Sequence, residues 1–195
     1  MILYKELDLP PLPTELKDFN FPMLKDVKDI GYGGNFIKDG KILSSCSYIT
    51  ANAQHELLTS WFAENLPEFA ELKRIYQIQT SRSPTGGTHI VHSDINRIFA
   101  LNYIVDTGGD NVLTSWYKEK NKPLRRSKSS GGRQTDSGAV DYNNLELLES
   151  VNFEKHKWYL IATDILHDVD NITGSRSSLS IAFYDTVLLT KMGFL

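Results

Sequence analysis

A series of short strand-like segments between residues 75 and 186 limits most strongly what this chain can fold into. Apolar and polar residues alternate within these segments, as in strands with one buried face. The predicted strands cover residues 75–80, 88–93, 97–105, 112–117, 145–154, 157–163 and 177–186. Turn-forming residues lie between strands at 106–111 and 170–175. Because no helix alternates regularly with the strands, the pattern predicts an antiparallel sandwich or barrel with helices packed outside.

The first third of the chain is expected to cover these strands. Residues 1–25 are rich in proline, which prevents a regular helix, so we expect an extended segment anchored by Leu and Phe side chains. From Ala51 the pattern becomes helical and places four apolar residues on one side of the helix: Leu57, Leu58, Trp61 and Phe62. A second short helix is predicted over 67–73. We interpret these helices as a layer that backs a sheet.

Length and composition indicate a single domain over residues 1–195. The chain has 41% hydrophobic residues and a net charge of −3, which is ordinary for a soluble globular protein and gives no field that favours nucleic acid. The lone Cys46 excludes an internal disulfide and is interpreted as a small buried hydrophobe. The sequence shows no signal peptide and no membrane-spanning run, so the expected location is cytoplasmic.

Residues 118–140 differ from the rest of the chain in composition. Basic residues alternate there with Ser and Gly, and apolar residues are nearly absent. Such a segment cannot offset its ordering entropy by burial, so we predict a flexible basic insertion between two strands. The alternative is a basic lid near the pocket, which would meet an acidic substrate, for example one that bears a phosphate. The segment has no interleaved aromatic residues, which argues against a surface that stacks on nucleic acid.

Three residues have the clearest chemical meaning: His92, Asp94 and His167. Residues two apart in a strand point the same way, so His92 and Asp94 present their side chains to one point. His167 is expected to approach from the end of a neighbouring strand. Two histidines and one carboxylate are the set that holds non-haem Fe(II) and leaves further positions open. Zinc suits the same ligands with an open water position, so the residues alone leave the metal undecided.

The predicted strand after Gly174 has one apolar face and one polar face. The polar face carries Arg176, Ser178, Ser180, Ala182 and Tyr184. A guanidinium fork with a nearby hydroxyl suits a carboxylate at the far end of a short dicarboxylate. The alternative for Arg176 is a surface position paired with an acidic residue such as Asp170.

In this order and on strands, His92-x-Asp94, His167 and Arg176-x-Ser178 resemble the 2-oxoglutarate/Fe(II)-dependent dioxygenase superfamily. The segments 97–103 and 158–171 are also similar to its hydroxylase-type members. The resemblance covers roughly residues 75–186, which would form the core of the domain. The long basic insertion between the first two ligands and His167 departs from the family pattern.

The resemblance implies an α+β, mainly β fold around a double-stranded β-helix (jelly-roll, cupin-like) core with the iron at one end. It implies that His92, Asp94 and His167 bind Fe(II), and that Arg176 and Ser178 hold the distal carboxylate of 2-oxoglutarate. The family reaction uses dioxygen, converts 2-oxoglutarate to succinate and CO2, and usually hydroxylates a second substrate. Family membership does not identify that second substrate.

Other candidates are weaker. Alternation allows only one of Asn102 and Tyr103 to face the site, where it could hydrogen-bond the co-substrate. In a regular strand His89 points away from His92, so it is not expected to be a ligand. Trp116 either lines the substrate side or packs in the core. The remaining histidines have no partner at ligand spacing and are interpreted as structural or exposed: His55 and His156.

Two other functions are open on the sequence. One is a cupin-like hydrolase or isomerase that uses zinc or another divalent metal. The other is a non-catalytic jelly-roll binding module that contacts an anionic partner through residues 118–140. The sequence does not indicate an oligomeric state. The partners expected for the oxygenase are 2-oxoglutarate, dioxygen and one further substrate, with no membrane.

Overall fold

The structure is a computed structural model of the chain. It describes residues 1–14, 25–30, 35–44, 48–52, 56–67, 78–83, 87–94, 97–121, 140–184 and 186–195. Several predictions fall outside these residues: Cys46, His55, almost all of the predicted helix over 67–73, and 122–139 within the basic insertion. Among the described helices, none is both long and apolar enough to cross a membrane.

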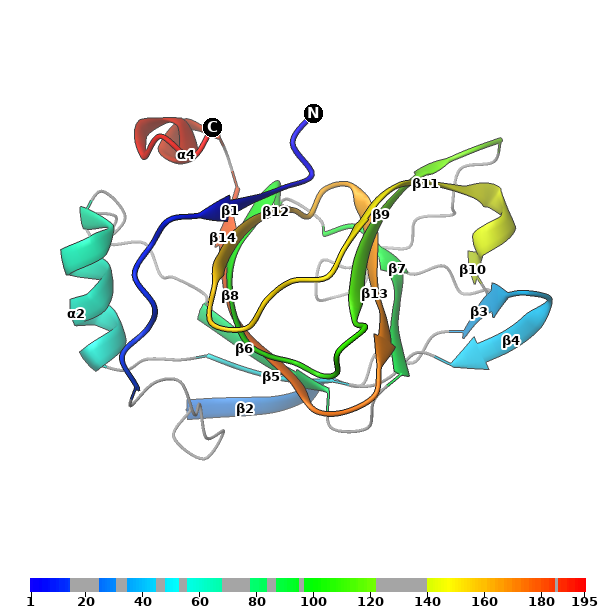
Figure 1. Cartoon of the computed structure of the whole chain (residues 1–195), viewed down its shortest axis with the longest axis horizontal. Coiled ribbons are helices and arrows are strands. Elements are labelled where there is room, and N and C mark those ends of the chain that lie inside the picture. Colours follow the sequence, from blue (N-terminus) through cyan, green and yellow to red (C-terminus); the bar gives the residue numbers. More distant parts are fainter. Residues whose placement is uncertain are drawn as a thin grey trace.

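The described chain is mainly β, as predicted (Figure 1). The strands are β1 (Tyr4–Leu7), β2 (Lys25–Ile30), β3 (Asn35–Lys38), β4 (Lys41–Ser44), β5 (Tyr48–Asn52), β6 (Ile78–Ser83), β7 (Gly87–His92), β8 (Phe99–Thr107), β9 (Leu113–Glu119), β10 (Val140–Asp141), β11 (Leu145–Val151), β12 (Trp158–Ala162), β13 (Leu166–Ile172) and β14 (Arg176–Phe183). The described helices are α2 (Glu56–Asn65), the short 3-10 helix η2 (Tyr142–Asn144) and α4 (Val187–Lys191).

Two antiparallel sheets form the body of the molecule. One has the strand order β1-β12-β8-β14-β6-β5-β2 and the other has the order β11-β9-β13-β7. From β6 to β9 and again from β11 to β14, the chain crosses from one sheet to the other at every step. A third, three-stranded sheet, β10-β3-β4, contains a parallel pair, β10 with β3. In Figure 1 it lies beyond β7, on the side away from the larger sheet.

The two large sheets face each other across an apolar layer. Ile104 of β8 and Ile161 of β12 pack there with Trp116 of β9, which is fully buried. Trp116 also stacks on Tyr4, with ring centroids 5.6 Å apart, and its Nε1 donates to the carbonyl of Ala162. Of its two predicted roles, Trp116 therefore takes the packing one.

The opposite face of the larger sheet packs against α2 (Figure 1). Leu58, Trp61 and Phe62 are buried there, and Trp61 stacks on Trp158 at 4.9 Å. The prediction of a helical layer is confirmed for α2, but two details were wrong. The strand β5 continues to Asn52 before the helix starts, and Leu57 is 41% exposed because only positions 58, 61 and 62 follow the i, i+3, i+4 spacing of one helix face.

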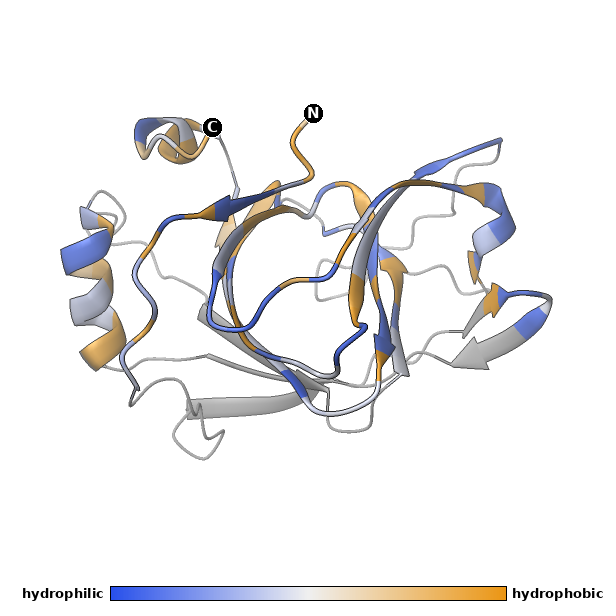
Figure 2. Ribbon diagram, viewed as in Figure 1, coloured by the Kyte–Doolittle hydropathy of each residue, from blue (hydrophilic) through white to orange (hydrophobic). Residues whose placement is uncertain are grey.

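From Met1 to Pro13 the N-terminal segment has no helical residue, as expected. β1 pairs antiparallel with β12, and Leu3, Leu7 and Leu12 are buried. Burial also differs between strands in the way their positions require. β12, between β1 and β8, is buried along its whole length, whereas β11 at a sheet edge is mostly exposed even though it carries Leu and Val residues (Figure 2).

One strand of the smaller sheet was missed by the sequence analysis. β13 covers Leu166–Ile172, where a turn had been predicted to begin at 170. Its sequence, LHDVDNI, has polar residues at four of its seven positions, so it shows no apolar alternation. The turn itself is shorter and follows Ile172; its Thr173 and Gly174 amides both donate to the carbonyl of Gly108, which joins it to the predicted turn over 106–111.

Candidate metal centre

His92 and His167 lie on adjacent strands and are direct register partners. His92 ends β7 and His167 is the second residue of β13, and their ring centroids are 4.5 Å apart. Each Nδ1 lies 2.8 Å from a backbone carbonyl two residues earlier, Ile90 for His92 and Ile165 for His167. A carbonyl only accepts, so both Nδ1 atoms carry the proton and the lone pair is on Nε2. Histidines that bind metals are held in this way.

Asp94 follows β7 and lies beside His92, as alternation predicted. Its backbone amide donates to the carbonyl of Thr163 at 2.7 Å, and its Oδ1 is 3.8 Å from His92 Nε2. The structure thus brings His92 next to both other predicted ligands. Within the described residues, however, no three His, Cys, Asp or Glu side chains converge closely enough to form a metal-binding group. The donor types and the imidazole tautomers fit a divalent metal.

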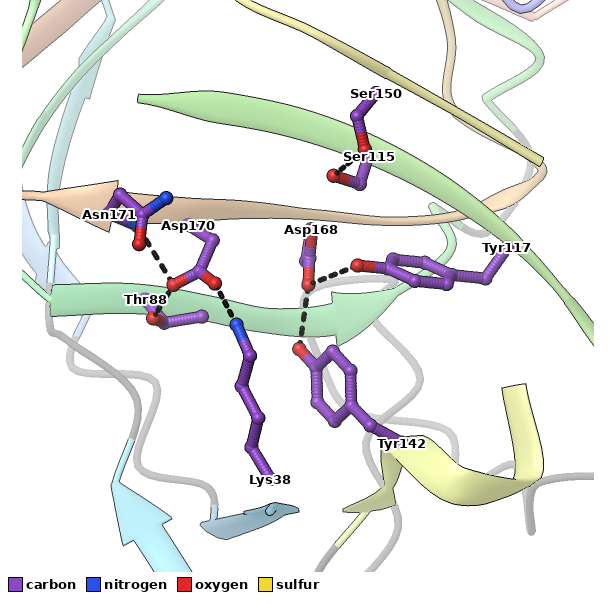
Figure 3. A network of polar contacts seen from close by, with 9 residues as sticks. All are labelled: Lys38, Thr88, Ser115, Tyr117, Tyr142, Ser150, Asp168, Asp170 and Asn171. Atoms are coloured by element: carbon purple, nitrogen blue, oxygen red, sulfur yellow. Dashed lines mark hydrogen bonds and ion pairs between the residues drawn. The ribbon is translucent and has the colours of Figure 1, made fainter. Parts of the chain in front are cut away.

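Arg176 and Ser178 lie on β14, and both are buried. Arg176 Nη1 donates to the carbonyl of Thr107 at 3.2 Å, which fixes one edge of the guanidinium. The alternative pairing of Arg176 with Asp170 was wrong. The Asp170 carboxylate instead binds Lys38 and Thr88, at the back of β13 (Figure 3).

Asn102 and Tyr103 point to opposite sides of β8. Tyr103 is fully buried in the layer against α2 and packs on Trp158 with ring centroids 4.9 Å apart. Asn102 is paired in register with Ser180 of β14, on the face that looks toward the smaller sheet. Tyr103 is therefore removed from the candidate co-substrate residues, whereas Asn102 remains one.

His89 lies on the same side of β7 as His92, contrary to the prediction. The β7–β13 pairing has a register shift: His92 faces His167 and His89 faces Val169, so β7 contains one more residue than β13 over this interval. The extra residue returns His89 to the inner face. Burial, followed by the positive charge of Arg176, lowers the pKa of His89 from 6.5 to about 3. With this lowered pKa the His89 imidazole is neutral at any physiological pH, in a setting where the charges of Arg176, His92 and His167 act on it.

His156 is exposed, as expected, in a turn where its backbone has a positive φ of 62°. Its backbone amide donates to the carbonyl of Ile104, and nothing places its ring near His92. This exposed histidine is a matched control for the two histidines of the site.

Two residues of the site were not singled out from the sequence. Arg97 had been interpreted only as the start of a strand, but its guanidinium contacts Asp94 Oδ2 at 3.2 Å and the Ser180 hydroxyl at 2.6 Å. Its position three residues after Asp94, at the start of the next predicted strand, was the available signal. Asp168 follows His167 directly, and its side chain points to the back of β13.

The back of β13 is held by a polar network (Figure 3). Asp168 is 1% exposed, and its Oδ2 accepts from the hydroxyls of Tyr142 at 2.8 Å and Tyr117 at 3.2 Å. Two residues later, Asp170 is bound by Lys38 of β3 and Thr88 of β7. These contacts tie the strand that carries His167 to both neighbouring strands, to η2 and to the small sheet.

No protein-family model and no curated protein sequence matches the chain. Among solved structures, the chain is similar to Escherichia coli ycfD, with 18% identity and a TM-score of 0.44 over 92% of this chain and 47% of that one. It is also similar to YcfD, a ribosomal oxygenase from Escherichia coli, in complex with cobalt and 2-oxoglutarate, with 16% identity and a TM-score of 0.44 over 93% and 46% of the two chains.

A third similar structure is an oxidoreductase of the 2OG-Fe(II) oxygenase family from Burkholderia pseudomallei, with 8% identity and a TM-score of 0.40 over 80% of this chain and 72% of that one. The chain spans about half the length of YcfD. The function proposed below rests on the side chains of the site.

Proposed function

We propose that this chain is an Fe(II)- and 2-oxoglutarate-dependent oxygenase that hydroxylates its substrate. The observation that carries the proposal is the pair His92 and His167. Both imidazoles are locked by backbone carbonyls with the lone pair on Nε2, their rings are 4.5 Å apart, and the Asp94 carboxylate lies beside His92. Two imidazole nitrogens and one carboxylate oxygen suit a divalent cation, the carboxylate neutralises part of its charge, and three ligands leave coordination positions open.

The strand arrangement supports a double-stranded β-helix, the jelly-roll core, for this domain. The chain alternates between two facing antiparallel sheets, and the orders β12-β8-β14-β6 and β11-β9-β13-β7 interleave strands that are distant in sequence. His92 and Asp94 then lie at the end of β7 and His167 near the start of β13. The proposed ligands thus gather at one end of the smaller sheet.

Within this proposal, Fe(II) would supply the redox chemistry that couples decarboxylation of 2-oxoglutarate to oxidation of the substrate. His92, Asp94 and His167 would hold the metal. Arg176, oriented by the Thr107 carbonyl, would bind the distal carboxylate of 2-oxoglutarate together with the Ser178 hydroxyl.

Asn102 and His89 would complete the polar surface around the co-substrate. Asn102 Oδ1 is buried and has no hydrogen-bond partner among the protein groups of the structure, so it is available to a donor on a bound molecule. The depressed pKa of His89 keeps this ring uncharged, so a protonated imidazole does not add to the positive charge of Arg176 and the metal.

The proposal is tested by adding Fe(II) and 2-oxoglutarate to the protein without oxygen. A visible metal-to-ligand charge-transfer band is expected, and succinate should form once oxygen and a substrate are admitted. His92→Ala and His167→Ala should each abolish the band, while His156→Ala, an exposed histidine, should keep it. Absence of both the band and succinate in a wild-type protein that binds the metal would exclude this function, and metal analysis of protein purified without oxygen would reveal a zinc enzyme instead.

A further inference from the structure

The guanidinium of Arg97 connects one carboxylate oxygen of Asp94 to Ser180 on β14. Nη1 is 3.2 Å from Asp94 Oδ2, and Nη2 donates to Ser180 Oγ at 2.6 Å. The other carboxylate oxygen, Oδ1, is the one that lies 3.8 Å from His92 Nε2. The two oxygens of Asp94 therefore have different surroundings: one faces a cation of the protein, and the other faces the imidazole nitrogen that carries a lone pair.

The backbone on both sides of this ion pair is held by one buried residue. Asp94 donates its amide hydrogen to the Thr163 carbonyl at 2.7 Å, and the Thr163 hydroxyl donates to the Arg97 carbonyl at 3.0 Å. The Thr163 amide donates to the carbonyl of Ile98 at 2.9 Å. Asp94 and Arg97 thus start from fixed positions, and their contact is not a chance encounter of two long surface side chains.

Arginine suits this position better than lysine. A guanidinium presents several donors in one plane and reaches an acid and a hydroxyl at the same time, whereas an ammonium on a flexible stem has no such fixed fork. The arrangement also has a cost, because Arg97 Nε is buried and has no hydrogen-bond partner in the structure. A buried donor left unsatisfied is unfavourable for stability, which points to a role in the site.

We propose that Arg97, anchored by Ser180, is the positioning residue that holds Asp94 by Oδ2 and so directs Oδ1 toward His92. The proposal rests on the proposed function for the identity of what Oδ1 binds, a divalent metal. The contacts of Arg97 with Asp94 and with Ser180 involve only residues of this chain. By acting on a ligand and not on the metal, Arg97 would tune affinity in the manner of the groups that orient metal-binding side chains.

The test uses Co(II) as the probe, titrated anaerobically into metal-free protein with all 195 residues of the chain and followed by its visible absorption. Arg97→Gln is expected to weaken Co(II) binding by roughly 10- to 100-fold. Ser180→Ala should weaken binding by a smaller factor, and Arg97→Lys should recover part of the loss by restoring the contact with Asp94 only. The double variant Arg97→Gln/Ser180→Ala should bind as weakly as Arg97→Gln alone, because Ser180 acts through Arg97.

Matched controls separate positioning from folding. Lys118→Gln breaks an exposed ion pair of 2.9 Å with Glu146, and Ser177→Ala removes a hydroxyl from β14 three residues before Ser180; neither should change Co(II) affinity. Thermal melting of the metal-free variants identifies any that are simply unfolded. Unchanged affinity in folded Arg97→Gln would overturn the proposal, and so would independent, additive losses in the double variant.

A second measurement does not depend on the metal. In metal-free protein, the carbon-13 resonance of the Asp94 carboxyl group should move in the same direction in Arg97→Gln and in Ser180→Ala. If wild-type protein does not bind Co(II), the proposed function fails, but this resonance still decides the role of Arg97. A resonance that moves in neither variant would overturn it.

Discussion

Asp168 is a buried acid directly behind the candidate metal centre. Its Oδ2 accepts two tyrosine hydrogen bonds, while Oδ1 is buried with no hydrogen-bond partner in the structure. Burial raises its pKa from 3.8 to about 7, and the hydrogen bonds from Tyr142 and Tyr117 only partly oppose that shift. Burial in the folded chain therefore favours the protonated form of the Asp168 carboxyl group.

The stability of the fold should consequently depend on pH through Asp168. Because its pKa is higher in the folded than in the unfolded chain, folding takes up a proton between pH 3.8 and about 7. This contribution to the free energy of unfolding is complete below pH 3.8 and is lost as the pH rises through about 7, by roughly 2–4 kcal/mol in total. Asp168→Asn, which cannot ionise, should remove it.

The measurement is urea unfolding of metal-free wild type and Asp168→Asn at a series of pH values. The variant should gain stability relative to wild type as the pH is raised from 4 toward 8 (roughly the interval between the two pKa values). Parallel stability curves for the two proteins would contradict the prediction.

The site has no room for a side chain at position 108, which is a glycine. Its φ is +84°, and a Cβ placed there would lie 2.9 Å from the Cβ of Arg176 and 3.0 Å from Ile172 Cγ2. Both neighbours are close to backbone and cannot swing away. A substitution at Gly108 therefore pushes on the residue proposed to hold 2-oxoglutarate.

Gly108→Ala is expected to lower both stability and the affinity for 2-oxoglutarate. Gly40→Ala is the matched control, because Gly40 has a similar φ of +73° but no heavy atom within 4 Å of the added Cβ. Both variants should lose about 1 kcal/mol from the strained backbone, whereas Gly108→Ala should lose roughly 1–3 kcal/mol more from the clash. Denaturant unfolding and 2-oxoglutarate titration measure the two effects, and equal behaviour of the two variants would refute the explanation.

At the scale of elements, α2 stabilises the larger sheet through the one helix face that carries Leu58, Trp61 and Phe62. Leu58 is fully buried against it, while its neighbour Leu57 is 41% exposed. Leu58→Ala should lower the free energy of unfolding by about 2–5 kcal/mol. Leu57→Ala should change it by roughly 0.5 kcal/mol or less, because an exposed side chain leaves no cavity. Chemical denaturation of both variants checks the prediction, and similar losses would mean that the helix packs differently.

The elements that could be predicted from sequence are those with one apolar face. The strands 97–105 and 157–163 correspond to β8 and β12, whose apolar residues face a core, and the extended N-terminal segment pairs with β12. β13 could not be predicted in this way. Its Asp168 and Asp170 are stabilised by tyrosines and a lysine from distant segments, so its polarity indicated a turn.

In the site, too, the features that depend on one strand could be predicted, and those that depend on distant segments could not. His92 and Asp94 come together because alternation within a strand is a local property, and His167 lies on the strand next to His92. His89 was misplaced because a bulge depends on how two strands pair, which one strand alone does not reveal. The roles of Arg97 and Tyr103 likewise depend on what the opposite sheet or helix presents to them.

At the scale of the whole molecule, the two large sheets have different roles. The larger one has an apolar side against α2 and a mixed inner side with Ser178, Ser180 and Asn102. The smaller one supplies the two histidines on its inner side and is braced from behind by the contacts of Asp168 and Asp170. Co-substrate and metal would thus be held by residues from different sheets, with the apolar layer around Trp116 fixing the distance between them.

The central position of β14 in the larger sheet has a consequence for folding during synthesis on the ribosome. β14 is the last of the described strands, yet it lies between β8 and β6, strands that are synthesised long before it. Until it emerges, each of those strands has an unpaired edge, the feature that most readily recruits other nascent chains. Folding must therefore wait for contacts of long sequence separation, which favours slow completion. Arg176, Ser178 and Ser180 arrive on that same strand, so closing the sheet and finishing the site are one event.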